Sequence, residues 1–126
     1  MDAALARARI TPREVGYVNM HGTGTPANDR VEDKALYRLF GNAVPCSSTK
    51  GWTGHTLGAA GITEAIISAL CLRHGYVPGS LNVRRVDPAL RSRIALEPET
   101  GDLRYVLSNS FGFGGSNCSL LFGRVS

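Results

Sequence analysis

The chain has 126 residues, of which 43% are hydrophobic and 19% charged, a balance that excludes an intrinsically disordered protein and fits a single domain over residues 1–126. Its formal net charge of +4 comes without a dense lysine or arginine run, so nucleic acid is not an expected partner. No apolar run approaches the roughly 20 residues of a membrane helix, and the first residues lack the pattern of a signal peptide, so we expect a cytoplasmic protein without a membrane span.

The first part of the chain is predicted to alternate helices with short strands. Thr11 and Glu14 form one capping-box pattern, and Asp29 and Glu32 form a second one that opens a helix with an apolar face. Gly41 is predicted to end that helix. The predicted elements are a helix at 2–9, a helical turn at 11–14, a strand at 17–20, a helix at 29–40 and a strand at 44–49.

The helix predicted at 58–74 has apolar residues on nearly every side, which is typical of a buried helix. Glu64 lies within this apolar sequence. A buried carboxylate needs a partner or loses its charge, and Lys50, in the loop predicted at 50–57, is the candidate just upstream. We therefore expect an ion pair between Lys50 and Glu64.

The last part of the chain is predicted to be rich in loops and to end in a β-hairpin. Residues 76–103 include a basic stretch that we interpret as a solvated loop rather than a docking patch. The basic residues are Arg84, Arg85, Arg91 and Arg93. A short edge strand is predicted at 93–96, and two paired strands at 105–109 and 117–122. The order of elements predicts an α/β fold with a mixed five-stranded sheet flanked by helices.

The three cysteines, Cys46, Cys71 and Cys118, are an odd number and form no CxxC pair. This pattern argues against a disulfide framework and against a zinc site, so no metal is expected. We predict reduced thiols that serve as small core residues, as in a cytosolic protein.

Three loops combine polar side chains with glycine at the ends of predicted strands. They cover residues 21–25, 47–55 and 109–115, and two of them contain a histidine. Sites in α/β folds lie at such strand ends. Taken singly, each loop also has a structural explanation, because a lone histidine, a glycine-threonine turn or two phenylalanines can belong to the core. None contains GxxxxGK[ST] or GxGxxG, so a nucleotide is not an expected ligand.

Taken together, the three loops resemble the C-terminal half of a β-ketoacyl synthase of the elongating type. The segments are HGTGTPAND at 21–29, SSTKGWTGHTLGAAG at 47–61 and SNSFGFGGSN at 108–117, in the order and at the spacing of that family. The resemblance covers nearly the whole chain. It implies a thiolase-like fold, in which two similar halves are each a mixed sheet flanked by helices.

The resemblance implies decarboxylative condensation of an acyl thioester with malonyl-acyl carrier protein, in fatty acid or polyketide synthesis. His21 and His55 match the histidines that stabilise the enolate formed when CO2 leaves. Lys50 matches a lysine that orders the site, and Glu64 matches a glutamate of the same buried polar network. The amide of Phe113 matches a hydrogen-bond donor to the acyl oxyanion.

Two further groups of residues are implied by the resemblance. Thr23 and Thr25 match threonines that hydrogen-bond the pantetheine arm of the carrier protein. The segment of Phe111, Gly112, Phe113 and Gly114 matches the family's loop that gates entry to the nucleophile. Substrates are therefore expected on the phosphopantetheine of acyl carrier protein, and no cofactor bound by the chain itself is expected.

The nucleophilic cysteine of the family belongs to an N-terminal half that this sequence lacks. Cys46 is followed by two serines, as that nucleophile is, but Thr49 and Lys50 assign the segment to the lysine motif. We therefore expect a fragment or separate domain that is inactive alone, exposes apolar surface, and works with the missing half in a homodimeric enzyme. The alternatives left open are a non-catalytic module that binds the carrier protein and a subunit that complements another chain.

Overall fold

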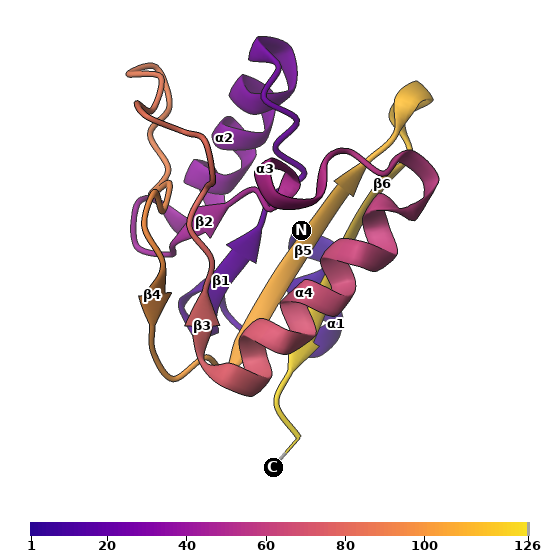
Figure 1. Ribbon diagram of the computed structural model, residues 1–126. Helices are drawn as coiled ribbons and strands as arrows, with labels where there is room; N and C mark the ends of the chain where they lie inside the picture. The colour runs from indigo at the N-terminus through magenta and orange to yellow at the C-terminus, as the bar shows by residue number, and fades with distance from the viewer. Residues whose placement is uncertain (126) are drawn as a thin grey trace.

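The computed structural model describes residues 1–125 and is built around a four-stranded mixed sheet (Figure 1). The strands lie in the order β2-β1-β5-β6. β1 runs parallel to both β2 and β5, and β6 pairs antiparallel with β5 as a hairpin. The bounds are β1 Val15–Asn19, β2 Cys46–Ser47, β5 Tyr105–Phe111 and β6 Asn117–Gly123.

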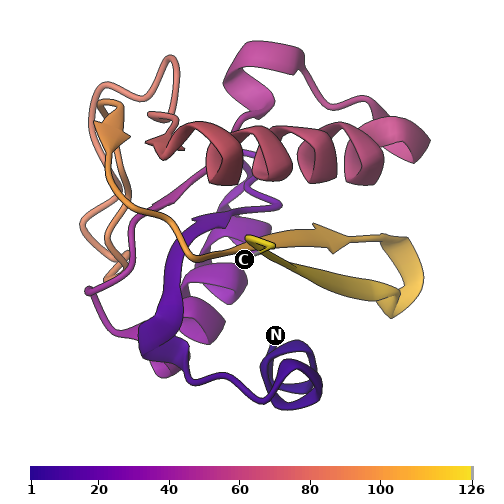
Figure 2. The same ribbon diagram turned by 90° about the horizontal axis from the view of Figure 1, so that it is seen from below.

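Helices cover both faces of the sheet, so the molecule has three layers (Figure 2). α1, Asp2–Ala8, and α2, Pro26–Phe40, lie against one face, and α4, Ala60–His74, lies across the other. Each face buries its own apolar cluster: Leu107 of β5 packs in the first and Val106 in the second, as the alternation of a strand requires. The mixed sheet flanked by helices confirms the predicted fold class. Of the helices in residues 1–125, none combines the length and apolarity needed to cross a membrane.

Shorter elements lie in the connections. β3, Tyr76–Val77, and β4, Glu99–Thr100, form a separate antiparallel pair. α3, Lys50–Thr53, is a single helical turn within the segment predicted to be a loop. One-turn 3₁₀ helices lie at Pro12–Glu14, Leu57–Ala59 and Phe113–Gly115. The Thr11 amide donates to the Glu14 carboxylate at 2.8 Å, which confirms the first predicted capping box.

The prediction of five strands in one sheet is wrong by one strand. The strand expected at 44–49 is reduced to Cys46–Ser47. The strand expected at 93–96 is reduced to a single parallel bridge between Ile94 and Cys46. Pro45 has no N–H to give to a ladder, and the chain turns into α3 soon after Ser47, so β2 cannot extend in either direction.

The helix predicted to begin at residue 29 begins at Pro26, after Thr25 as the N-cap residue. Proline is favoured in the first helical turn because its missing N–H would have no partner there. Asp29 and Glu32 therefore lie inside α2, and the second predicted capping box is wrong. Glu32 is instead buried, with only 1% of its surface exposed.

α4 is buried on one side only, which corrects the prediction of a helix buried all round. Glu64 and Ser68 lie on its buried side. Ile62, Ile66 and Leu70 repeat every fourth residue along the other side and are 62%, 55% and 47% exposed. We call these three side chains the α4 stripe. No described residue covers the stripe, and a contiguous exposed apolar surface is typical of a face that meets another protein surface.

Two of the three cysteines are core residues, as predicted. Cys46 and Cys71 are buried, and burial raises the pKa of the Cys71 thiol to about 11, so this thiol is neutral and unreactive at physiological pH. Cys118 lies on β6 and is exposed, so its predicted place in the core is wrong. The reason is that β6 is an edge strand, which leaves most of its side chains half-buried or exposed.

Candidate functional site

The three polar loops meet at one edge of the sheet. Because β1, β2 and β5 are parallel, their C-terminal ends lie together. His21 follows β1, Lys50 follows β2, and Phe111 ends β5. His55, in the connection from α3 to α4, joins them: its ring centroid lies 5.6 Å from that of His21. The centroid of the Phe111 ring lies 5.5 Å from that of the His21 ring. The fold therefore brings all three predicted loops into one site.

A buried carboxylate holds the start of the His21 loop. Glu32 of α2 accepts the backbone N–H of His21 at 2.9 Å and that of Gly22 at 2.8 Å. The side-chain amide of Asn109, on β5, donates to the same carboxylate at 3.1 Å. Burial raises the pKa of Glu32, and these donors oppose that shift. The sequence predicts no site role for Glu32, which fits the predicted capping box with Asp29, or for Asn109, which ends a predicted strand.

Gly22 joins the first loop to the second, and no other residue type fits its place. Its φ is 34°, and a Cβ there would lie 2.5 Å from the Cβ of Ser48. The Ser48 hydroxyl donates to the Gly22 carbonyl at 2.6 Å. The loops after β1 and β2 are therefore in direct contact.

Lys50 and Glu64 form the predicted ion pair, and both side chains are more than nine-tenths buried. The Lys50 ammonium also donates to the His21 carbonyl oxygen at 2.6 Å. The Ser110 hydroxyl donates to the second carboxylate oxygen of Glu64 at 3.5 Å. Lys50 thus ties α4 to the loop that carries His21, and a charge so well enclosed is fixed in position.

Both imidazoles have their Nδ1 atoms occupied by donors. The Leu57 amide donates to His55 Nδ1 at 3.2 Å. Nδ1 of His21 lies 3.4 Å from the Lys50 ammonium, which can only donate. In the neutral form each ring therefore carries its proton on Nε2. The site presents two Nε2–H donors from rings that meet edge to face, at an interplanar angle of 85°.

His21 is neutral at physiological pH. Burial lowers its pKa from 6.5 to about 4, and the positive charge of Lys50 acts in the same direction. A neutral imidazole still donates through Nε2–H, so this shift keeps His21 in the protonation state that a hydrogen-bond donor of fixed geometry needs.

The environment of His21 predicts a low titration midpoint. In NMR spectra of the purified chain, we expect the His21 ring resonances to titrate near pH 4 rather than 6.5. The unfolded chain binds this proton more readily, so the contribution of His21 to the free energy of unfolding is complete above pH 6.5 and is lost as pH falls toward 4. The variant Lys50→Met should raise the midpoint, because it removes a nearby positive charge. A midpoint near 6.5 in the folded wild type would contradict the environment described here.

The loop after β5 places its two phenylalanines differently. Phe111 is half-buried beside His21, whereas Phe113 is fully exposed and is not a core residue. Gly114 and Gly115 have φ values of 80° and 87°, a backbone conformation that favours glycine. The loop therefore turns sharply and leaves the Phe113 side chain in solvent.

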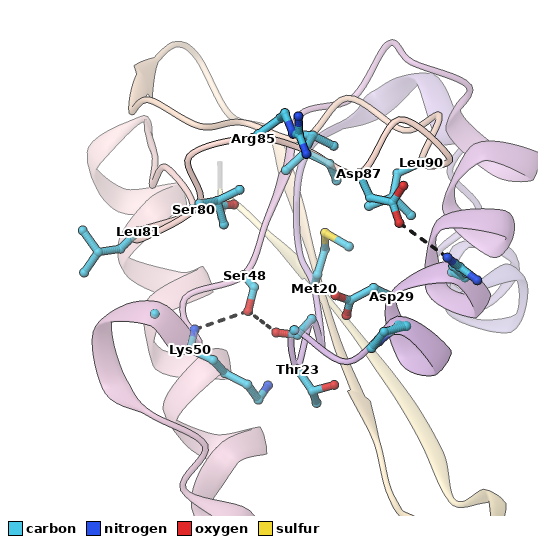
Figure 3. A pocket seen from close by; sticks show the side chains of 18 of the residues that line it. Met20, Thr23, Asp29, Ser48, Lys50, Ser80, Leu81, Arg85, Asp87 and Leu90 are labelled. Carbon is cyan, nitrogen blue, oxygen red and sulfur yellow. Dashed lines mark hydrogen bonds and ion pairs between the residues drawn. The ribbon is translucent and has the colours of Figure 1, made fainter.

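Two cavities flank the histidine pair. The Thr cavity, of about 560 Å³, has a lining that includes Thr23, Ser48, Lys50 and His55 (Figure 3). The Phe cavity, of about 670 Å³, has a lining that includes His21, His55, Phe111 and Phe113. His55 lines both cavities, so one imidazole stands between them. The hydroxyl of Thr25 lies 2.8 Å from that of Thr23, which places the second predicted threonine beside the first.

Cys118 lines the Phe cavity, but no hydrogen bond in residues 1–125 joins its thiol to either imidazole. Over the same residues, no three histidine, cysteine, aspartate or glutamate side chains converge as a metal site requires. The described site thus offers two Nε2–H donors, from neighbouring imidazoles, beside a cavity. Such donors stabilise negative charge that develops on a substrate oxygen.

Comparison with known protein families agrees with this geometry. The family described as "Beta-ketoacyl synthase, C-terminal domain" matches residues 1–84. The chain is similar to 3-oxoacyl-[acyl-carrier-protein] synthase 2 of Vibrio harveyi, with 47% identity over 133 residues. That match covers 100% of this chain and 32% of the relative, so the chain spans about a third of the relative's length.

Solved structures show the same likeness. A β-ketoacyl synthase from Burkholderia phymatum STM815 superposes with a TM-score of 0.94 at 41% identity, over 100% of this chain and 31% of that one. The chain also superposes, with a TM-score of 0.91 at 30% identity, on one chain of a solved complex. That complex is described as a type II polyketide synthase acyl-carrier protein with its ketosynthase, bound to the hexaketide. This second match covers 99% of this chain and 32% of the solved chain.

Proposed function

Because the chain belongs to the β-ketoacyl synthase family, as its C-terminal domain, we propose that it supplies the decarboxylation half of a condensing site. The complete site joins an acyl thioester to malonyl-acyl carrier protein, with loss of CO2, in fatty acid or polyketide synthesis. We use "complete synthase" for this chain together with the polypeptide, joined or separate, that supplies the acylating cysteine.

The pair of Nε2–H donors carries the proposal. When the malonyl carboxylate leaves as CO2, its bonding electrons pass into the thioester carbonyl, and the oxygen becomes an enolate. His21 and His55 donate to that oxygen, while Lys50 and Glu64 fix the loop that holds His21. One well-placed donor of this kind is worth about 3–4 kcal/mol of transition-state stabilisation. The α-carbon of the enolate then attacks the acyl thioester on the missing cysteine.

The remaining residues of the site are assigned to holding the substrates. Thr23, which lines the Thr cavity, and Thr25, whose hydroxyl lies 2.8 Å from that of Thr23, hydrogen-bond the pantetheine arm, and the Phe113 amide donates to the acyl oxyanion. Phe111 and Phe113, next to Gly112 and Gly114, gate the route to the cysteine. The carrier protein is the expected partner, supported by the solved ketosynthase complex with its acyl-carrier protein. No cofactor held by the chain itself takes part.

The α4 stripe is the face on which we place the missing half of the fold. Its three apolar side chains are exposed in this chain, and the chain spans only about a third of its relative. We infer that the other half covers the stripe and that the complete synthase is a homodimer. The buried unpaired thiols of Cys46 and Cys71 suit a reducing compartment, which favours the cytoplasm.

The test measures CO2 release from a malonyl thioester and formation of the β-ketoacyl product by the complete synthase. Both products are expected, with CO2 release depending on His21 and His55. Tight binding of the carrier protein without CO2 release would favour the alternative of a non-catalytic binding module. An immunoblot of the source cell shows whether the cysteine lies in the same polypeptide or in a separate one.

A further inference from the structure

One guanidinium group in the Thr cavity has no carboxylate partner among residues 1–125. Three lysine and arginine side chains line that cavity. Lys50 pairs with Glu64, and Arg30 lies 3.8 Å from Asp87. Arg85 forms no ion pair and no side-chain hydrogen bond with any other described residue. An unpaired guanidinium at a cavity presents its full set of donors to an incoming anion.

The loop that carries Arg85 is fixed to the body of the molecule at both ends. The buried carboxylate of Asp33, in α2, accepts the backbone N–H of Ser92 at 2.8 Å. Before Arg85, the loop packs on α3 so closely that a Cβ at Gly51 would lie 2.4 Å from the Leu81 carbonyl oxygen. A cation on an anchored loop loses less conformational entropy on binding than one on a free loop.

Arg85 lies at the opposite end of the Thr cavity from Lys50 and Thr23 (Figure 3). His55 and Lys50 both line the cavity and both lie against His21, so they mark its reacting end. Asp29 lies near the Thr23 end, so an anionic group is disfavoured there. The cavity therefore suits an elongated ligand with its reactive group at the histidines and a negative charge at the far end.

We propose that Arg85 binds the phosphate of the phosphopantetheine arm when the arm occupies the Thr cavity, an inference that rests on the function proposed above. That arm has a thioester at one end and a phosphate at the other, joined by a chain of neutral amides. The guanidinium of Arg85, at the far end of the cavity from Lys50, suits the phosphate, and Asp87 beside it is paired with Arg30. A guanidinium fits a phosphate because both can share two parallel N–H···O hydrogen bonds.

Acidic side chains of the carrier protein are the competing anions. Arg85 lines the cavity itself, which a single extended arm enters more readily than the surface of a folded protein. The neighbouring residue Arg84 is also exposed and has no ion-pair partner in residues 1–125, but it is not among the residues that line the cavity. Arg84 is therefore a control of equal charge at almost the same place.

The experiment compares malonyl-phosphopantetheine with malonyl-pantetheine, both free of carrier protein, as substrates of the complete synthase. The two thioesters differ only by the phosphate. We expect the wild type to have a KM about 3- to 10-fold lower for the phosphorylated thioester at low salt. Arg85→Ala should abolish that difference by raising the KM for malonyl-phosphopantetheine to the value for malonyl-pantetheine. Arg84→Ala should keep the difference, and Arg85→Lys should keep part of it.

Three results would overturn the inference. The first is a preference for the phosphorylated thioester that survives Arg85→Ala, and the second is no preference in the wild type. The third is an effect of Arg85→Ala only when the substrate is attached to carrier protein, which would assign Arg85 to protein carboxylates. Turnover of neither thioester by the wild type would instead contradict the proposed function, and this inference with it.

Discussion

Replacing His21 with alanine is expected to lower the kcat of condensation by the complete synthase about 100- to 1,000-fold, while the enzyme still forms its acyl-cysteine intermediate. Under the proposed function, the lost Nε2–H is one of two donors to the enolate, and acylation takes place before decarboxylation. His55→Ala should lower the kcat of condensation by a factor of the same order. Condensation is measured by formation of the β-ketoacyl product, and acylation by the mass of the intact protein after incubation with acyl thioester.

Two further variants make this result specific. His74 lies exposed at the end of α4, and His74→Ala should leave both steps unchanged. His55→Gln keeps an N–H donor in a neutral side chain, so it should recover part of the rate that His55→Ala loses. Normal condensation in the His21→Ala variant would contradict the proposed site. A loss of acylation equal to the loss of condensation would point to a general structural defect instead.

Replacing Lys50 with methionine is expected to lower the free energy of unfolding of the chain by about 3–5 kcal/mol. The variant leaves the Glu64 carboxylate buried, with the Ser110 hydroxyl as its remaining side-chain partner. It also removes the donor to the His21 carbonyl. The measurement is unfolding by urea, followed by circular dichroism with wild type and variant at the same pH.

The double variant Lys50→Met/Glu64→Leu separates the ion pair from the packing around it. Removing both charges leaves no unpaired buried group, so the double variant should be more stable than Lys50→Met alone. The matched control is Arg124→Met, which breaks the surface pair with Asp102, whose side chain is 85% exposed. Arg124→Met should lower the free energy of unfolding by less than about 1 kcal/mol. If Lys50→Met and Arg124→Met lowered the free energy of unfolding equally, the buried position of the Lys50–Glu64 pair would not increase its contribution to stability.

The Lys50–Glu64 pair could be predicted from the sequence because the requirement for it is local and strong. A carboxylate within an apolar helix must find a cation, and Lys50 lies just before that helix. Glu32 could not be recognised in the same way, because its place after Asp29 also fits a capping box. Its partners are backbone amides of the His21 loop and the side chain of Asn109, which only the folded sheet brings near.

The sequence also could not show which apolar surfaces stay uncovered. The α4 stripe consists of isoleucine and leucine, residue types that are usually buried, whereas the buried side of the helix includes Glu64 and Ser68, so the sequence pattern alone indicates a core helix. Similarly, the strand predicted at 93–96 has suitable residues but makes only one bridge, at Ile94. Whether an apolar face or a strand finds a partner depends on contacts between distant segments, and a local pattern does not contain that information.

The position of β5 between β1 and β6 has a consequence for the order in which the protein can be made. β1 is synthesised before its neighbour β5, and α2, β2, α3 and α4 lie between them in the sequence. Pairing between strands so far apart is slow, because most of the chain must first be confined. During translation, His21, Lys50 and His55 all leave the ribosome before Asn109. Asn109 donates to the Glu32 carboxylate that holds the His21 loop. The Glu32 carboxylate therefore gains its Asn109 donor, and the His21 loop its full support, only after β5 has been synthesised.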